Sequence, residues 1–173
     1  QLNLLRSDIK IVPMRGNIDT RISKLKKKEF DAIVLSLAGI QMLSLEKEIN
    51  EIFSTEQMLP AIGQGAIAMQ CKKDDKKTLD ILNKVNDDET FFCIQAERAL
   101  LEAIGGDCDT AIGGLAKLSG EKIFLKSELF SNDGKKKFEF ESSGNFKEAK
   151  EIGYKVGKEL LKKAGSNFTT QGS

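Results

Sequence analysis

The spacing of apolar residues changes from a helical to an alternating period across the glycine-rich segment 104–113, IGGDCDTAIG. Before this segment a helical pattern runs from about Asp88 to Ile104, and Gly105 is a typical residue at which a helix ends. After it, apolar and polar residues alternate in three short stretches, which predicts strands with one buried face. We therefore expect the second half of the chain to form a small α+β domain with a three-stranded antiparallel sheet.

A hairpin and a closing helix complete this predicted domain. The Asn-Asp-Gly segment 132–134 separates the last two strands and is typical of a hairpin turn. The final helix has acidic residues early and lysines late, as the helix dipole favours, and ends at Gly165. The first strand is expected over Ile112 to Leu118. The predicted inward-facing residues are Ile123, Leu125 and Leu129 in the second strand, Phe138 and Phe140 in the third, and Ala149, Ile152, Val156 and Leu160 in the helix.

The first part of the chain has the pattern of a parallel α/β unit. Ile9–Met14 predicts a strand, a helix begins near Ile18 with Asn17 as its N-cap, and the continuous apolar run Phe30–Leu37 predicts a strand buried on both faces. The crossover of such a βαβ unit is right-handed. We expect a partial parallel α/β domain here.

A connector separates the two predicted parts. Leu59–Gly65 contains one proline and two glycines, which favours a loop between domains, and the apolar run Ala66–Cys71 after it predicts a further strand. A short amphipathic helix is expected over about Leu45–Phe53. Another helix is expected after the connector, capped by Asp74 or Asp75.

Composition excludes several classes of protein. The 27 basic and 26 acidic residues give a net charge of +1, so no overall field attracts nucleic acid or a membrane. With no histidine and no C-x-x-C pair, the usual zinc and iron–sulfur patterns are absent and no metal is expected. The longest nearly unbroken apolar run, Ala32–Ile40, is too short to span a bilayer, and Gln1 opens no signal-peptide pattern. We expect a cytoplasmic protein.

One thiol is in an unusual setting for a free cysteine. Cys108 lies in the glycine-rich loop between Asp107 and Asp109, whereas Cys71 and Cys93 lie in apolar patterns typical of buried cysteines. The two aspartates and the end of the preceding helix disfavour a thiolate, so a redox role is not expected. A thiol presented in this way can form one permanent bond to an electrophilic carbon. The alternative is a surface cysteine in a tight turn.

Two arginines indicate an anion site. Arg15-Gly16-Asn17 lies where the first predicted strand ends, which is where open parallel sheets bind ligands. The free amides at the helix start favour an anion, and Arg21 adds a second guanidinium one turn later. Two such groups suit carboxylates or phosphates. The alternative is that Arg15 pairs with a local acid and Arg21 is a solvated helix residue.

Four segments, taken together in their order and spacing, resemble the porphobilinogen deaminase family, also called hydroxymethylbilane synthases. They are Arg15–Arg21, Leu59–Ala66, Glu97–Ala99 and Gly105–Cys108. The resemblance implies a transferase of tetrapyrrole biosynthesis that joins four porphobilinogen molecules into hydroxymethylbilane and releases ammonia. In this family a dipyrromethane cofactor, held by a thioether, primes the growing chain.

The resemblance also implies roles for individual residues. Cys108 matches the cysteine to which the cofactor is attached. Arg15 and Arg21 match arginines that bind the acetate and propionate groups of the cofactor and of the growing chain. The family has a further arginine where this chain has Met42. The family's catalytic aspartate lies in a region that would precede Gln1, so no catalytic residue is expected in this chain.

The resemblance divides the chain into three parts. Residues 1–59 match most of the second domain, of the periplasmic-binding-protein-like type; residues 60–87 match a hinge and a segment returning through the first domain; residues 88–173 match the third. Because the returning strand would lack its neighbours, we expect the chain alone to be inactive and to self-associate, and the full-length protein to be a monomer. The competing hypothesis is a non-catalytic module that binds a small polycarboxylate through Arg15 and Arg21.

Overall fold

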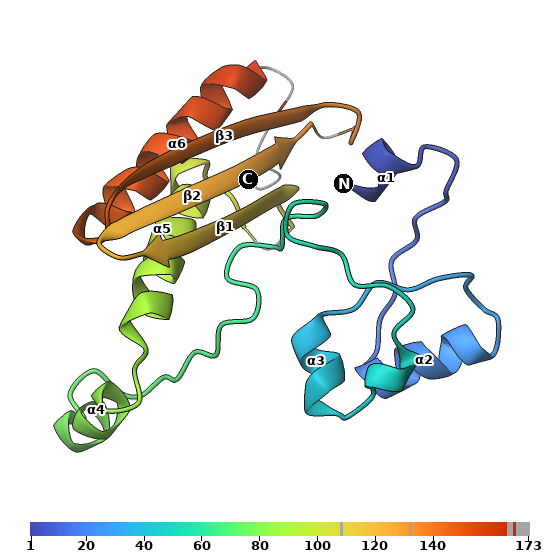
Figure 1. The fold of residues 1–173 in the computed structure, drawn as a ribbon, viewed down its shortest axis with the longest axis horizontal. Helices are drawn as coiled ribbons and strands as arrows, with labels where there is room; N and C mark the ends of the chain where they lie inside the picture. Colours follow the sequence, from blue (N-terminus) through green and yellow to red (C-terminus); the bar gives the residue numbers. More distant parts are fainter. Residues whose placement is uncertain (108, 132, 166–167, 169–173) are drawn as a thin grey trace. The chain divides into compact units, whose positions relative to one another are not determined.

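The computed structural model describes residues 1–107, 109–131, 133–165 and 168. The chain forms two compact units, and each is described by itself (Figure 1). The N-terminal unit is Leu2–Ser54, and the C-terminal unit is Gln1 together with the chain from Thr55 onward.

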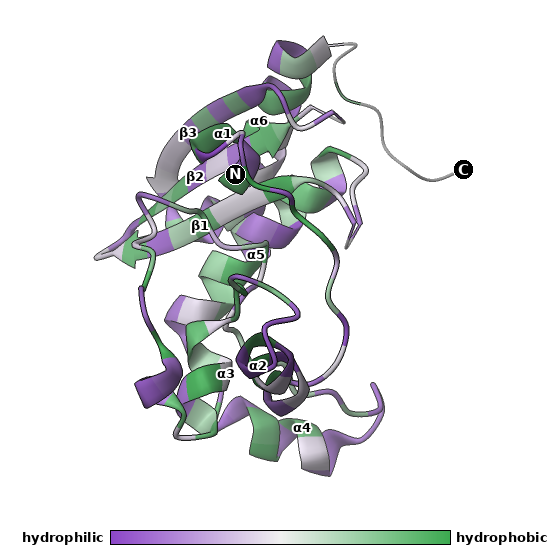
Figure 2. Ribbon diagram, turned by 90° about the vertical axis from the view of Figure 1, so that its right-hand side faces the viewer, coloured by the Kyte–Doolittle hydropathy of each residue, from purple (hydrophilic) through white to green (hydrophobic). Residues whose placement is uncertain are grey.

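The C-terminal unit is built on the predicted antiparallel sheet. Its strands are β1 (Ile112–Ser119), β2 (Lys122–Phe130) and β3 (Lys137–Asn145), in the order β1-β2-β3 with both pairings antiparallel (Figure 1). Hydrophilic and hydrophobic residues alternate along β3, as the ribbon in Figure 2 shows, because successive side chains of a strand face opposite sides of the sheet. The three-stranded sheet is therefore confirmed.

Two helices, α5 (Asp88–Ala103) and α6 (Ala149–Ala164), cover one face of this sheet (Figure 1). A single-turn 3₁₀ helix, η2 (Phe146–Glu148), leads into α6. The fully buried side chains of this layered core are Leu100, Ile123, Leu125, Leu129, Val156 and Leu160. The apolar stripe predicted for the last helix is therefore confirmed as its buried face.

Glycines on α6 allow the two helices to approach closely. A Cβ atom on Gly153 would overlap the carbonyl oxygen of Ala96 in α5. One on Gly157 would lie 2.6 Å from the Cβ of Ala103. Larger side chains at either position would force the helices apart.

Side-chain caps and positive-φ glycines define the helix ends of this unit. Asp87 caps α5 by accepting a hydrogen bond from the amide of Thr90, and Asp75 caps α4 (Lys76–Asn83) in the same way. Gly105 and Gly165 follow α5 and α6 with φ of +64° and +53°, as the sequence predicts for helix stops.

No helix within the described ranges is long and apolar enough to cross a membrane.

The N-terminal unit consists of short helices joined by extended segments. They are α1 (Leu2–Leu5), α2 (Ile18–Lys26), α3 (Leu37–Met42) and the single-turn η1 (Glu46–Glu48). Asn17 is the predicted N-cap of α2, and its Oδ1 accepts a hydrogen bond of 2.9 Å from the amide of Thr20. Ile22 and Ile40 are the buried apolar residues of this unit.

The three parallel strands expected before residue 72 are not present among the described residues. Ile9–Met14, Phe30–Leu37 and Ala66–Cys71 form no strand, so these strand predictions were wrong and the structure does not show the predicted parallel α/β domain. A strand needs a neighbour to accept its backbone hydrogen bonds, and the described chain places none beside these segments. Ile67, 84% exposed, shows how little covers the third of them.

The end of the apolar run Phe30–Leu37 and the short helix expected after it also differ from the predictions. The apolar run ends not as a strand but in α3, which begins at Leu37 with Ser36 as its N-cap. Short apolar runs do not distinguish a strand from a helix by their period. The amphipathic helix expected over Leu45–Phe53 is reduced to the single turn η1, since a helix so short is stabilised mainly by packing, and Ile52 is 59% exposed.

Candidate functional site

The first candidate site is the turn that begins α2. Gly16 has a φ of +121°, a conformation that favours glycine, and it precedes the N-cap Asn17. The Nε of Arg21 donates a hydrogen bond of 2.8 Å to the carbonyl oxygen of Gly16. This bond holds the guanidinium of Arg21 beside the helix start. Among the described residues its terminal nitrogens have no partner, so they are available to an anion.

Arg15 lies directly before this turn, and its side chain is exposed. No hydrogen bond or ion pair joins that side chain to another residue of the described chain, so the local acid pairing considered from the sequence does not form. Arg15 precedes Gly16 along the chain and Arg21 bonds the carbonyl oxygen of Gly16, at a helix start whose free amides also favour negative charge.

Small residues near this turn have a structural explanation. A Cβ on Gly39 would lie 2.6 Å from the Cδ1 of Ile18, so Gly39 allows α3 to pack against α2. Met42, at the position where the family has an arginine, ends α3 and is 80% exposed. Neither residue adds a positive charge to the turn.

The second candidate site is the loop that joins α5 to β1. Cys108 itself lies outside the described residues, but its neighbours are bonded to one another. The hydroxyl of Thr110 accepts a 2.8 Å hydrogen bond from the amide of Asp107, and the Oδ1 of Asp107 accepts one of 3.0 Å from the amide of Asp109. These bonds join Asp107 to Asp109 and Thr110.

Both ends of this loop are fixed to the C-terminal unit. The amide of Gly106 donates to the carbonyl of Leu101 at 3.0 Å, and the amide of Ile112 donates to the carbonyl of Thr110 at 2.8 Å. A Cβ on Gly106 would lie 2.8 Å from both Leu101 Cδ1 and Thr110 Oγ1, so a glycine is needed for the loop to close this tightly. The described residues of the loop are thus bonded to one another, and Asp107 and Asp109 are exposed.

A buried carboxylate that sequence reasoning missed lies two turns before the loop. Glu97 of α5 is 4% exposed; its Oε1 accepts a 2.8 Å hydrogen bond from the amide of Ala116, and its Oε2 accepts one of 2.7 Å from the amide of Gly63. Burial raises the pKa of this carboxyl, and the two backbone hydrogen bonds oppose the rise. Its position between Ala96 and Leu100 on the apolar face of the helix was the available signal.

Cys93 lies one turn before this carboxylate and is half-buried. Burial, followed by the charges of Glu97 and Glu89, raises the pKa of its thiol. The prediction of a core cysteine is consistent with this setting, since Cys93 packs against the hydrophobic core.

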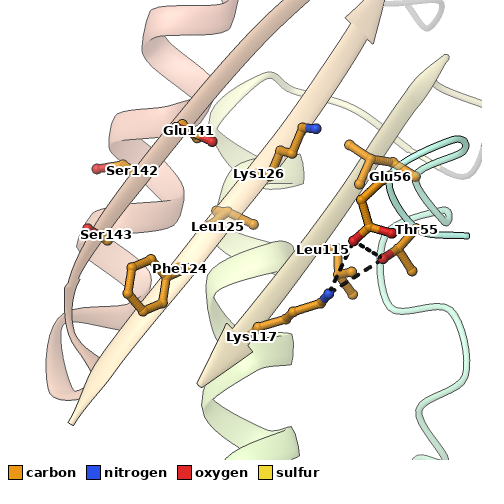
Figure 3. A pocket seen from close by; sticks show the side chains of 11 residues that line it. Thr55, Glu56, Leu115, Lys117, Phe124, Leu125, Lys126, Glu141, Ser142 and Ser143 are labelled. Atoms are coloured by element: carbon orange, nitrogen blue, oxygen red, sulfur yellow. Dashed lines mark hydrogen bonds and ion pairs between the residues drawn. The ribbon is translucent and has the colours of Figure 1, made fainter. Parts of the chain in front are cut away.

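The open face of the sheet carries a hollow of about 410 Å³ (Figure 3). Its two lysines do not make it an anion site, because each faces an acid: Lys117 is 3.8 Å from a carboxylate oxygen of Glu56, and Lys126 is opposite Glu141 in the strand register. Within the described ranges no group of three or more histidine, cysteine or acidic side chains is placed to hold a metal ion. The two loops above therefore remain the candidate sites.

Comparisons with known proteins place both loops in one family. Residues 1–80 match the family model described as porphobilinogen deaminase, dipyromethane cofactor binding domain, and residues 91–162 match porphobilinogen deaminase, C-terminal domain. The chain is 37% identical over 166 residues to the porphobilinogen deaminase of Syntrophomonas wolfei, covering 96% of this chain and 54% of that protein. It is 39% identical over 168 residues to that of Coxiella burnetii, covering 97% and 55%.

The chain belongs to the porphobilinogen deaminase family. A third relative, the porphobilinogen deaminase of Sorangium cellulosum, is 40% identical over 161 residues, which cover 91% of this chain and 54% of the relative. The chain thus spans about half the length of the curated relatives it matches.

Proposed function

We propose that the whole protein is a transferase of tetrapyrrole biosynthesis that joins four porphobilinogen molecules into hydroxymethylbilane with release of ammonia. The observation that carries this proposal is the match of two successive domains of one enzyme family, in order, over residues 1–80 and 91–162. The relatives that carry the name of this enzyme align with nearly the whole chain.

Cys108 is the proposed attachment point of a dipyrromethane cofactor, through a thioether. The support is the loop around it: the hydrogen bonds of Asp107 and Thr110 fix the backbone on both sides, and the flanking residues are exposed. The bound cofactor supplies the end from which the pyrrole chain grows.

Arg15 and Arg21 are the proposed ligands of the acetate and propionate groups on the cofactor and the growing chain. A guanidinium binds a carboxylate through two parallel hydrogen bonds, and Arg21 is held at the helix start by its bond to Gly16. The same helix start contributes a favourable dipole for negative charge. These residues bind and orient; no residue of this chain is assigned a proton-transfer role.

The proposal includes the organisation of the whole protein. Residues 1–59 would belong to a second, parallel α/β domain, 60–87 to a hinge and a returning segment of the first, and 88–173 to the third. The exposed Ile67 and Met69 support a covering by further chain, and this chain alone is proposed to be inactive and to self-associate, whereas the full-length protein is monomeric. The free thiols of Cys71 and Cys93 suit the cytoplasm.

The attachment is tested by intact-mass measurement and peptide mapping of the full-length protein. We expect an adduct with the mass of two joined pyrroles on the peptide that contains Cys108, and none in the Cys108→Ser variant. An unmodified thiol in an active enzyme would overturn the cofactor assignment. A protein that lacks both adduct and turnover, yet binds small polycarboxylates, would support the non-catalytic module instead.

The arginines are tested by Arg21→Ala in the same protein, with Lys27→Ala at the opposite end of α2 as the matched control. Loss of a charged hydrogen-bonding partner is expected to weaken binding of the growing chain by roughly 1.5 to 3 kcal/mol per contact, so elongation stalls at an intermediate length. The control should elongate normally. Equal kinetics for Arg21→Ala and wild type at every step would exclude this role.

A further inference from the structure

The free edge of β1 is covered without another strand. Successive amides of a strand point in opposite directions, so every second N–H of β1 faces away from β2. Those of Gly114, Ala116 and Leu118 all have partners: the carbonyl of Pro60 at 2.9 Å, the carboxylate of Glu97 at 2.8 Å, and the thiol of Cys93.

Two of these partners come from α5 and one from the connector. Cys93 and Glu97 are one turn apart on the same helix, so they face the edge of β1 together. Pro60 belongs to residues 59–65, the segment that the sequence indicates as a connector. The edge of the sheet is therefore the place where helix and connector meet.

Glu97 joins all three segments through a single group. Its Oε1 accepts a hydrogen bond from the amide of Ala116 in β1, and its Oε2 accepts one from the amide of Gly63 in the connector. Its own backbone belongs to α5. Both oxygens accept, and no basic side chain in the described part of the chain pairs with them. A carboxylate fits this place because it offers two acceptors; the amide of a glutamine offers one.

The connector is also packed on the strand. Leu59 is 4% exposed, and its backbone N–H and C=O are both bonded by the side-chain amide of Gln1, at 2.9 and 2.8 Å. A Cβ on Gly113 would lie 3.0 Å from that of Leu59, and one on Gly114 would lie 2.6 Å from the Cδ1 of Ile62. Two adjacent glycines in β1 therefore make room for the connector.

We propose that Glu97 is a positioning residue that fixes the connector to α5 and β1, so that the connector and residues 105–107 at the end of α5 keep one fixed geometry. The hydrogen bonds of Glu97 alone support the fixing of the connector to α5 and β1. The consequence for cofactor chemistry rests on the proposed function, because it takes position 108 as the attachment point.

The direct test is amide hydrogen exchange in the full-length protein, with Glu97→Gln compared with Glu102→Gln, an exposed glutamate on the same helix. The glutamine keeps one acceptor for Ala116 in the sheet and turns its NH2 group toward Gly63. We expect exchange at Gly63 to rise roughly 10- to 100-fold, while exchange at Leu125 in the core stays at the control's rate. Unchanged exchange at Gly63 would overturn the proposal.

A second variant decides the case in which Glu97→Gln does not fold. Glu97→Asp keeps both acceptors but is one methylene shorter, so it is expected to release Gly63 and keep Leu125 protected. If both variants lose protection at Leu125, Glu97 is needed for folding as a whole and the positioning role is refuted.

Kinetics separate this inference from the proposed function. If wild type carries an adduct at Cys108, the Glu97→Gln enzyme should carry it too, with kcat lowered about 10- to 100-fold and KM nearly unchanged, since a small misplacement affects the reacting geometry more than substrate binding. A rise in KM as large as the fall in kcat would contradict the positioning role. A wild type without adduct would refute the proposed function while leaving the exchange result valid.

Discussion

The two units of the chain differ in what holds them together. In the C-terminal unit, a hydrogen-bonded sheet and two helices enclose a continuous core that includes Leu100 and Leu125, with 0% and 1% exposure. In the N-terminal unit, the helices have good caps, yet Ile22 and Ile40 are its buried apolar residues. Local signals such as caps therefore suffice to start helices, but a layered arrangement is needed to bury their apolar faces.

The largest expected contrast comes from cavity-forming substitutions in the two units. Leu100→Ala should lower the free energy of unfolding of the C-terminal unit by about 2 to 5 kcal/mol, because its surroundings are packed on all sides. Ile22→Ala should lower the free energy of unfolding of the N-terminal unit by less than about 2 kcal/mol, since this sparsely packed unit can close around the space. Urea unfolding measures both, and Ile81→Ala, at a site 55% exposed, is the neutral control. Equal losses would remove the contrast.

A smaller effect is expected at the contact between α5 and α6. Alanine is the better helix former by about 1 kcal/mol, yet Gly153→Ala should destabilise the C-terminal unit by about 1 to 3 kcal/mol, because its Cβ meets the backbone of Ala96. Lys150→Ala, exposed on the same helix, provides the control. Thermal unfolding distinguishes the outcomes, and a stabilised Gly153→Ala variant would show that the helices separate easily.

The smallest effect is a pH dependence confined to the C-terminal unit. Because burial raises the pKa of Glu97 in the folded state, the folded protein holds this proton more tightly than the unfolded chain does. The stability contribution is complete below the ordinary pKa of a glutamate and is lost as pH rises through the raised value. The free energy of unfolding of wild type relative to Glu97→Gln should therefore fall over that range. If the free energy of unfolding of wild type relative to Glu97→Gln instead grew with pH, this prediction would be wrong.

Prediction from the sequence succeeded where a period persisted over several turns or strands. The stripe of α6 and the strand positions of Ile123 and Leu125 follow from local spacing, as does a cap at Asp74 or Asp75, of which the structure has Asp75. Phe30–Leu37 did not, because a strand exists only with hydrogen-bonding neighbours, which the residue pattern does not supply. Its last residue instead begins α3.

The candidate sites were predictable to different degrees. The turn of Arg15 and Arg21 follows from a glycine, a cap residue and helical spacing, all of which are local. The role of Glu97 does not follow from local spacing, because its partners Gly63 and Ala116 are 34 and 19 residues away along the chain. Sequence spacing reveals contacts within one helix or strand far better than contacts that join three separate segments of the chain.

The covered border of β1 has a consequence for how the protein behaves at high concentration. Its outward amides at Gly114, Ala116 and Leu118 are already bonded, so a strand from another molecule would first have to displace a carbonyl, a carboxylate and a thiol. Groups from a helix and a connector thereby oppose growth of the sheet at this edge.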